Sequence, residues 1–279
     1  MLDQRFGPLR VRLSPELPGQ SPPAQDPRAL VVLLHGYGAP GSDLVPLASY
    51  YNAPPARLSA LGVRFAFPEA PLKLSPVFDS RAWWAIDLEA LEAALAAGTH
   101  RDRTVEDPPG MSAATDALAS CLDALERELR PRRLIVGGFS QGSMLACDLV
   151  ARGRQIDGLM VLSGTLLAAD RWRAGFAALS ASRKSRAGAA GTAQPALPVF
   201  QSHGHQDPLL GMREAELLRD SFISAGFEHR WSPFVGAHEI PPSVLSGSSQ
   251  FIADLVGRAE GDASAANTGS QAERAEREP

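Results

Sequence analysis

Short apolar runs alternate with longer amphipathic segments along this chain, and this alternation constrains the fold more than any other feature. The runs that predict strands are residues 30–34, 63–67, 134–136, 159–162 and 198–201, with weaker candidates at 9–13 and 230–234. The segments that predict helices are residues 111–130, 141–152, 210–225 and 243–256. Strands that alternate with helices are typical of a mostly parallel central sheet flanked by helices on both faces, so the sequence predicts an α/β fold.

The domain organisation follows from length and local composition. A chain of 279 residues fits one α/β domain, which we place at residues 1–257. Residues 15–27 are rich in proline and predict a surface loop. Residues 180–195 are rich in Ala, Gly, Ser and Arg and predict a flexible insertion, whereas residues 258–279 lose their apolar bulk and predict a disordered C-terminal tail.

Charge and cysteine content exclude several classes of partner and site. The formal net charge is −4 and the basic residues are scattered, which gives no electrostatic reason to expect nucleic acid binding. The N-terminus lacks the apolar core of a signal peptide, and no apolar run is long enough to cross a membrane. Cys121 and Cys147 fall in predicted helices without metal-ligand spacing. We therefore expect a cytoplasmic protein without a disulfide framework. We also expect no cofactor.

A possible nucleophile stands at a predicted strand-to-helix junction. Residues 138–142 read Gly-Phe-Ser-Gln-Gly, which matches the G-x-S-x-G pattern, with an apolar run before it and a helical segment after it. In this setting the serine lies on a tight, strained turn, where a base and a substrate can both reach it. The context predicts that Ser140 is the nucleophile of an α/β-hydrolase.

The general base and the acid should follow the nucleophile in the chain, in the order Ser, acid, His. Of the six histidines, His238 lies in a loop between the last predicted strand and the last helix, where an open α/β sheet forms its crevice. Asp207 lies in the loop after an earlier predicted strand. Asp157 precedes its strand and Asp170 fits a helix start, so Asp207 is the stronger candidate for the acid that orients His238.

An oxyanion hole needs two backbone N–H groups that face the nucleophile. In this fold one donor comes from the residue after the nucleophile, here Gln141. The second comes from the loop after an early strand, where residues 35–38 read His-Gly-Tyr-Gly. We predict Tyr37 as that second donor and keep Gly38 as an alternative.

Several segments together resemble one known family. They are residues 34–38 (Leu-His-Gly-Tyr-Gly), 138–142, 203–207 (His-Gly-His-Gln-Asp) and 236–238 (Gly-Ala-His), with weaker support from 81–84 (Arg-Ala-Trp-Trp) and 162–164 (Leu-Ser-Gly). Over about residues 30–256 the chain resembles the phospholipase/carboxylesterase family, which includes acyl-protein thioesterases. The resemblance implies an α/β-hydrolase without a large cap domain, no metal, and Ser140, Asp207 and His238 as triad, with Tyr37 and Gln141 as oxyanion donors.

The resemblance implies cleavage of carboxylic esters or thioesters, so we expect a small-molecule ester or thioester as the substrate. Residues 83–87 read Trp-Trp-Ala-Ile-Asp, where the family has a shorter aromatic–Asp step. Trp83 and Trp84 either line the acyl site or pack against the sheet edge. Two other functions stay open: a ligand-binding protein without turnover, and acyl transfer or amide cleavage by the same triad. The sequence also leaves open whether residues 72–110 form a mobile lid.

Overall fold

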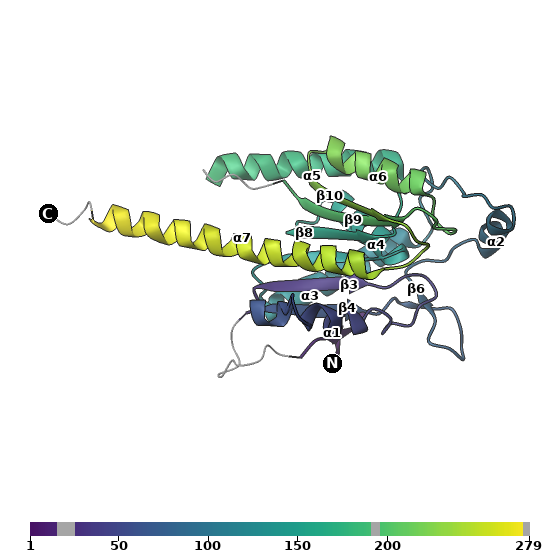
Figure 1. The fold of residues 1–279 in the computed structure, drawn as a ribbon, viewed down its shortest axis with the longest axis horizontal. Coiled ribbons are helices and arrows are strands. Elements are labelled where there is room, and N and C mark those ends of the chain that lie inside the picture. The colour runs from purple at the N-terminus through teal and green to yellow at the C-terminus, as the bar shows by residue number, and fades with distance from the viewer. Residues whose placement is uncertain (16–25, 191–195, 276–279) are drawn as a thin grey trace.

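The computed structural model describes residues 1–15, 26–190 and 196–275, and its centre is one eight-stranded sheet (Figure 1). The strand order is β1–β2–β4–β3–β7–β8–β9–β10. Its members are β1 (Leu2–Phe6), β2 (Leu9–Leu13), β3 (Ala29–Leu34), β4 (Val63–Pro68), β7 (Leu134–Phe139), β8 (Gly158–Leu162), β9 (Pro198–Gly204) and β10 (Glu228–Phe234). The six strands from β4 to β10 pair in parallel, and β1 and β2 add an antiparallel edge. The predicted mostly parallel α/β sheet is confirmed.

Helices surround this sheet, and a small hairpin of two short strands lies beside it. The helices are α1 (Pro46–Asn52), the 3-10 helix η1 (Leu58–Leu61), α2 (Leu88–Ala96), α3 (Met111–Leu129), α4 (Gln141–Ala151), α5 (Ala169–Ala190), α6 (Met212–Ser224) and α7 (Pro242–Ala275). The hairpin pairs β5 (Leu72–Lys73) with β6 (Arg81–Ala82). The sequence missed β1, α1 and α5, because neither a short edge strand nor a helix with a weak apolar face leaves a clear pattern.

Two hydrophobic cores cover the two faces of the sheet. Along β3, Leu30, Val32 and Leu34 join the core formed with α3, α4, α5 and α6, whereas Val31 and Leu33 join the core formed with α1 and α7. This is the two-residue period of a strand buried on both faces, and it explains why the run is continuously apolar. In Figure 1, α7 crosses the view in front of the strands, and its C-terminal part projects beyond the other elements.

The predicted insertion is partly helical. Residues 180–190 continue α5, where Ser180 and Arg183 are buried and Arg183 donates a hydrogen bond to the Ile156 carbonyl at 3.0 Å. The Ala, Arg and Lys in this stretch favour a helix once the preceding turns are packed, so the composition was misleading here. Residues 191–195, and most of the predicted proline-rich loop at 16–25, lie outside the described residues.

The predicted tail begins inside α7, which continues to Ala275 without a break at residue 258. The backbone there is helical, and Ala, Glu and Arg are residues with high helix propensity. Disorder of residues 258–279 therefore stays a prediction.

Two smaller features bear on the environment of the chain. Among the described residues, no helix has both the length and the apolar character needed to cross a membrane. Cys121 and Cys147 are buried, free thiols, and burial raises the pKa of Cys121 to about 12. Neither thiol is therefore suited to act as a nucleophile at neutral pH.

Candidate active site

Ser140 lies on the turn between β7 and α4, in a backbone conformation that serine rarely adopts. Its φ is 52° and its ψ is −121°, and its N–H donates to the Leu162 carbonyl at 2.8 Å. Such a left-handed φ is strained for a residue with a side chain, and it persists only where the surroundings enforce it. This is the tight turn that the sequence predicted.

The two glycines of the turn are required by close packing against β3. A Cβ built on Gly138 would lie 2.4 Å from the carbonyl oxygen of Leu34, and one on Gly142 would lie 2.1 Å from the same atom. No carbon atom can approach an oxygen so closely, so any larger residue would push α4 away from the sheet. The position of Ser140 is therefore fixed by backbone contacts.

The predicted acid and base come together from two neighbouring strands. Asp207 follows β9, His238 follows β10, and the distance from His238 Nδ1 to Asp207 Oδ2 is 2.6 Å. The other carboxylate oxygen of Asp207 accepts the N–H groups of Leu209 and Leu210 at 2.9 and 3.0 Å. These bonds hold the carboxylate in place and leave Nε2 of His238 without a partner among the described residues.

Asp207 is ionised although it is buried. Burial alone would raise its pKa, but the hydrogen bond and charge of His238, with the N–H donors of Leu210 and Leu209, outweigh that effect and lower the pKa below its ordinary value. A second imidazole, His203, lies beneath the pair with Nε2 at 3.5 Å from Asp207 Oδ2 and 2.9 Å from the Leu210 carbonyl. Burial lowers the pKa of His203, so it stays neutral.

Ser140 and His238 line the same cavity, which has a volume of about 440 Å³. The ring of Phe139, next to Ser140, lies 4.7 Å from the His238 ring, centroid to centroid. Among the described residues no hydrogen bond joins the Ser140 hydroxyl to His238, and such bonds are often loose before a substrate binds. Tyr37, Gln141 and Trp84 also line this cavity.

The two candidate donors after β3 differ in whether their N–H groups are occupied. The N–H of Gly38 donates to the Arg81 carbonyl at 2.8 Å. The N–H groups of Tyr37 and Gln141 have no acceptor among the described residues, and both residues border the cavity. The structure therefore leaves Tyr37, and not Gly38, with an N–H that can bind an oxyanion.

The two tryptophans have different positions. Both side chains are almost completely buried, but Trp84 borders the cavity, whereas Trp83 does not and donates its indole N–H to the His35 carbonyl at 2.9 Å. Of the two positions considered from the sequence, a place at the cavity fits Trp84 and a packed place fits Trp83, and contact with the substrate stays a prediction. The Gln141 side chain holds the backbone of both tryptophans, because its oxygen accepts the backbone N–H of Trp83 at 2.9 Å and its NH₂ group donates to the Trp84 carbonyl at 2.8 Å. Sequence reasoning missed this role of Gln141.

The other histidines and aspartates that we weighed have separate roles. His35 is buried and accepts the Ala70 N–H through Nε2, and burial lowers its pKa. His100 bonds the Asp207 carbonyl through Nε2 at 2.8 Å. Asp157 accepts the Leu134 N–H at the opposite edge of the sheet, and Asp170 lies in the first turn of α5. None of these groups competes with Asp207 and His238 for the cavity.

Comparisons with known proteins place the chain in one family. The model of the phospholipase/carboxylesterase family matches residues 20–256. Acyl-protein thioesterase 1 of Eremothecium gossypii is 27% identical over 82% of this chain and 88% of its own length, and that of Saccharomyces cerevisiae is 26% identical over 82% and 93%.

Solved structures share the fold. The crystal structure of esterase PE8 superposes with a TM-score of 0.66 at 25% identity and covers 88% of this chain and 99% of its own. Acyl-protein thioesterase 2 of Zea mays superposes with a TM-score of 0.61 at 21% identity, over 88% of this chain and 99% of its own. The chain therefore belongs to the phospholipase/carboxylesterase family of α/β-hydrolases and is a hydrolase of the esterase and thioesterase type.

Proposed function

We propose that this hydrolase cleaves carboxylic esters or thioesters through an acyl-enzyme formed on Ser140. The observation that carries the proposal is the 2.6 Å contact between His238 Nδ1 and Asp207 Oδ2 at a cavity that Ser140 also lines. The contact directs the free Nε2 of the imidazole away from Asp207, which is the orientation that a general base needs.

The two chemical steps use the same groups. His238 Nε2 removes the proton of the Ser140 hydroxyl as its oxygen attacks the substrate carbonyl, and it then gives that proton to the leaving alcohol or thiol. A water molecule then attacks the acyl carbon as His238 takes its proton; the bond from that carbon to the Ser140 oxygen breaks, His238 returns the proton to Ser140, and the carboxylic acid leaves. Asp207 remains ionised throughout and stabilises the imidazolium, in line with its lowered pKa.

The tetrahedral intermediate carries a negative oxygen that must be stabilised. We assign this role to the N–H groups of Gln141 and Tyr37, which border the cavity and have no other acceptor among the described residues. Removal of one such donor typically costs about a hundred- to a thousandfold in kcat. The N-terminus of α4 adds its positive dipole end at the same point.

The cavity favours an acyl group that is at least partly apolar. Trp84, Met144 and Leu209 line it together with Ile86 and Leu91. The curated relatives are named acyl-protein thioesterases, which supports a thioester or ester of this kind as the substrate. We also propose the cytoplasm as the compartment, since two free, buried thiols are compatible with it.

A fluorophosphonate probe tests the nucleophile. We expect covalent labelling of the wild type at Ser140 and none of Ser140→Ala, whereas Ser143→Ala, a serine three residues further along α4, should still be labelled. Labelling of Ser140→Ala, or labelling of another residue in the wild type, would contradict the proposal.

A panel of p-nitrophenyl esters and thioesters of graded chain length tests the reaction and its acyl preference. We expect turnover that Ser140→Ala abolishes, with acid as the main product even when an alcohol or amine is added in excess. If most of the acyl group is instead transferred to the added alcohol or amine, the reaction is acyl transfer and not hydrolysis.

A further inference from the structure

The loop that presents the Tyr37 N–H is held from behind by one short segment, residues 80–81. The Gly38 N–H donates to the Arg81 carbonyl at 2.8 Å, and the Arg81 N–H donates to the Ala39 carbonyl at 3.1 Å. The hydroxyl of Ser80 donates to the Gly38 carbonyl at 2.9 Å. Gly38 and Ala39, which directly follow Tyr37, are thus both hydrogen-bonded to the backbone of Arg81.

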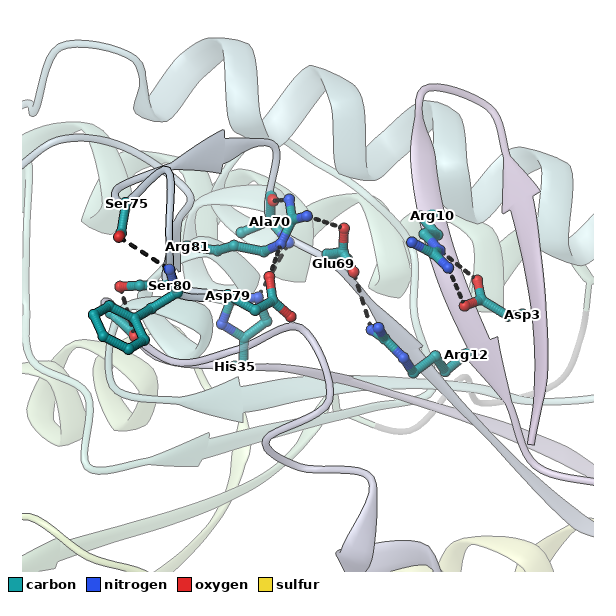
Figure 2. Close-up of polar contacts among 12 residues, drawn as sticks. Asp3, Arg10, Arg12, His35, Glu69, Ala70, Ser75, Asp79, Ser80 and Arg81 are labelled. Carbon is teal, nitrogen blue, oxygen red and sulfur yellow. Dashed lines mark hydrogen bonds and ion pairs between the residues drawn. The ribbon is translucent and has the colours of Figure 1, made fainter.

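The Arg81 side chain anchors this segment to the body of the fold (Figure 2). Its guanidinium reaches Glu69 Oε1 at 2.6 Å, the Ala70 carbonyl at 3.1 Å and Asp79 Oδ1 at 2.7 Å. All of its nitrogens are therefore engaged, and the planar fork fixes their relative positions. Residues 69–70 follow directly after β4, which lies next to β3 in the sheet.

Glu69 is itself fixed and nearly buried. Its side chain is 6% exposed, and its second oxygen is 3.1 Å from Arg12 on β2. The next residue, Ala70, donates its N–H to Nε2 of His35 at 3.1 Å, one residue before the turn begins. Figure 2 shows His35, Glu69, Ala70 and Arg81 gathered around this point. The loop is therefore bonded at His35, before Tyr37, and at Gly38 and Ala39, after it.

From this arrangement we infer that Arg81, held by Glu69, is a positioning residue that aims the Tyr37 N–H at the oxyanion. The inference rests on the proposed function, in which that N–H stabilises the tetrahedral intermediate. Arg81 is not among the residues that line the described cavity, so it acts through the backbone and does not touch the substrate. Misplacing a donor by a fraction of an ångström weakens its bond to the transition state more than it weakens ground-state binding.

The test compares Arg81→Met and Arg81→Lys with Arg10→Met. Arg10 forms an ion pair with Asp3 at 2.6 Å on the exposed face of the β1–β2 hairpin and appears in the same view, but it does not contact the loop. It is the matched control for the loss of an arginine ion pair. Thermal unfolding is measured for every variant, so that any loss of fold is seen separately from a loss of rate.

The expected result for Arg81→Met is a kcat lowered by about ten- to a hundredfold with KM within about twofold of the wild type. Binding of a trifluoromethyl ketone, whose adduct with Ser140 carries an oxyanion, should weaken by the same factor, whereas binding of the carboxylic acid product should not change. Arg81→Lys keeps the charge but not the fork, and should lose about three- to tenfold in kcat. Arg10→Met should keep both constants.

The outcomes distinguish the positioning role of Arg81 from the proposed function of the protein. If Arg81→Met does not fold, Arg81→Lys carries the test alone. Folded Arg81 variants with unchanged kcat, or with equal losses in ketone and product binding, overturn the positioning role while the Ser140-dependent turnover of the wild type keeps the proposed function. A wild type that neither turns over esters nor reacts with the fluorophosphonate overturns both.

Discussion

The turn that carries Ser140 and the segment of residues 85–110 border the same cavity, but they are held in opposite ways. Every residue of α4 is buried, whereas no residue of α2 is. The turn is fixed by steric contact with β3, where Gly142 lies against the Leu34 carbonyl. The segment extends away from the sheet and forms the outer end of the molecule in Figure 1, where α2 lies apart from the other helices.

The outer segment is attached by a few polar bonds, whereas α4 is attached by packed side chains. His100 bonds the Asp207 carbonyl at 2.8 Å, and Asp107 forms an ion pair with Arg171 at 2.9 Å. Two backbone bonds from the start of α5 reach the carbonyls of Thr104 and Glu106 at 2.7 and 2.9 Å. The reactive groups therefore stand on a rigid scaffold, whereas the wall of the cavity formed by residues 85–110 is held by fewer packed side chains.

A pair of glycine substitutions breaks this contrast most strongly. In Gly142→Ala the new methyl group would collide with backbone atoms, so we expect a loss of more than about 3 kcal/mol of stability and at least a hundredfold loss of kcat. Gly98, just after α2, has nothing within 4 Å of the corresponding position but has a φ of +64°. Gly98→Ala should therefore cost only about 1 kcal/mol and leave kcat nearly unchanged. Chemical denaturation and ester turnover measure both. Similar losses for the two variants would contradict a rigid turn and a loose wall.

Arg171 offers the next test, because it contacts both regions. It reaches Asp148 of α4, which is 1% exposed, at 2.5 Å, and Asp107 of the outer segment, which is 60% exposed. Asp148→Ala would also leave the Trp172 indole N–H without a partner and remove one of the two acceptors of the Thr115 hydroxyl, and should cost about 3–5 kcal/mol of stability. Asp107→Asn should cost less than about 1 kcal/mol. Denaturant unfolding curves decide, and a larger cost for Asp107→Asn would reverse the comparison.

Acid should lower the free energy of unfolding through His229, which lies on β10. Burial, together with the charge of Arg219, lowers the pKa of His229 to about 4 from an ordinary value of 6.5. Below pH about 6.5 the unfolded chain therefore binds a proton that the folded chain refuses, and stability falls as the pH falls through that window. His229→Gln keeps an N–H donor for Gln201, to which His229 Nε2 bonds at 2.9 Å. Between pH 7 and pH 5 the free energy of unfolding of the variant should therefore fall by up to about 2 kcal/mol less than that of the wild type. Equal losses would show that His229 does not carry the effect.

The smallest expected effect sharpens the role of the outer segment. His100→Phe keeps a ring but removes the donor to the Asp207 carbonyl, which is worth about 1 kcal/mol. We expect kcat/KM for long-chain esters to fall by up to about fivefold, with fluorophosphonate labelling of Ser140 unchanged. Loss of labelling would mean that His100 supports the acid itself and not the wall.

Much of the scaffold could be predicted because its determinants are local in the chain. The runs at β3, β4, β7, β8 and β9 are buried on both faces and are therefore mostly apolar, although β4 contains Arg64 and β9 ends with polar residues. The turn at Ser140 was visible for the same reason, since a tight strand-to-helix junction requires glycines at fixed offsets. α5 was missed as a whole, and the composition of its last part does not show that Arg183 is packed.

The site was predictable as far as chain order and strand ends could place it. Ser140, Asp207 and His238 follow β7, β9 and β10, and parallel strands bring their carboxyl ends to one edge. The same reasoning could not separate Trp83 from Trp84, or Tyr37 from Gly38. The two residues of each pair are adjacent in the chain, and they differ only in the partners that they contact across the fold.

The amino-acid sequence by itself determined the parallel sheet, the strained serine turn and the order of the candidate triad, because periodicity, glycine spacing and strand ends are written in neighbouring residues. Only the tertiary structure decided that the Gly38 N–H is occupied by Arg81, that Arg81 is anchored on Glu69, and that Trp84 alone of the two tryptophans faces the cavity. These facts depend on hydrogen bonds and ion pairs between segments far apart in the chain, whose partners are chosen by three-dimensional packing and leave no periodic signal in the sequence.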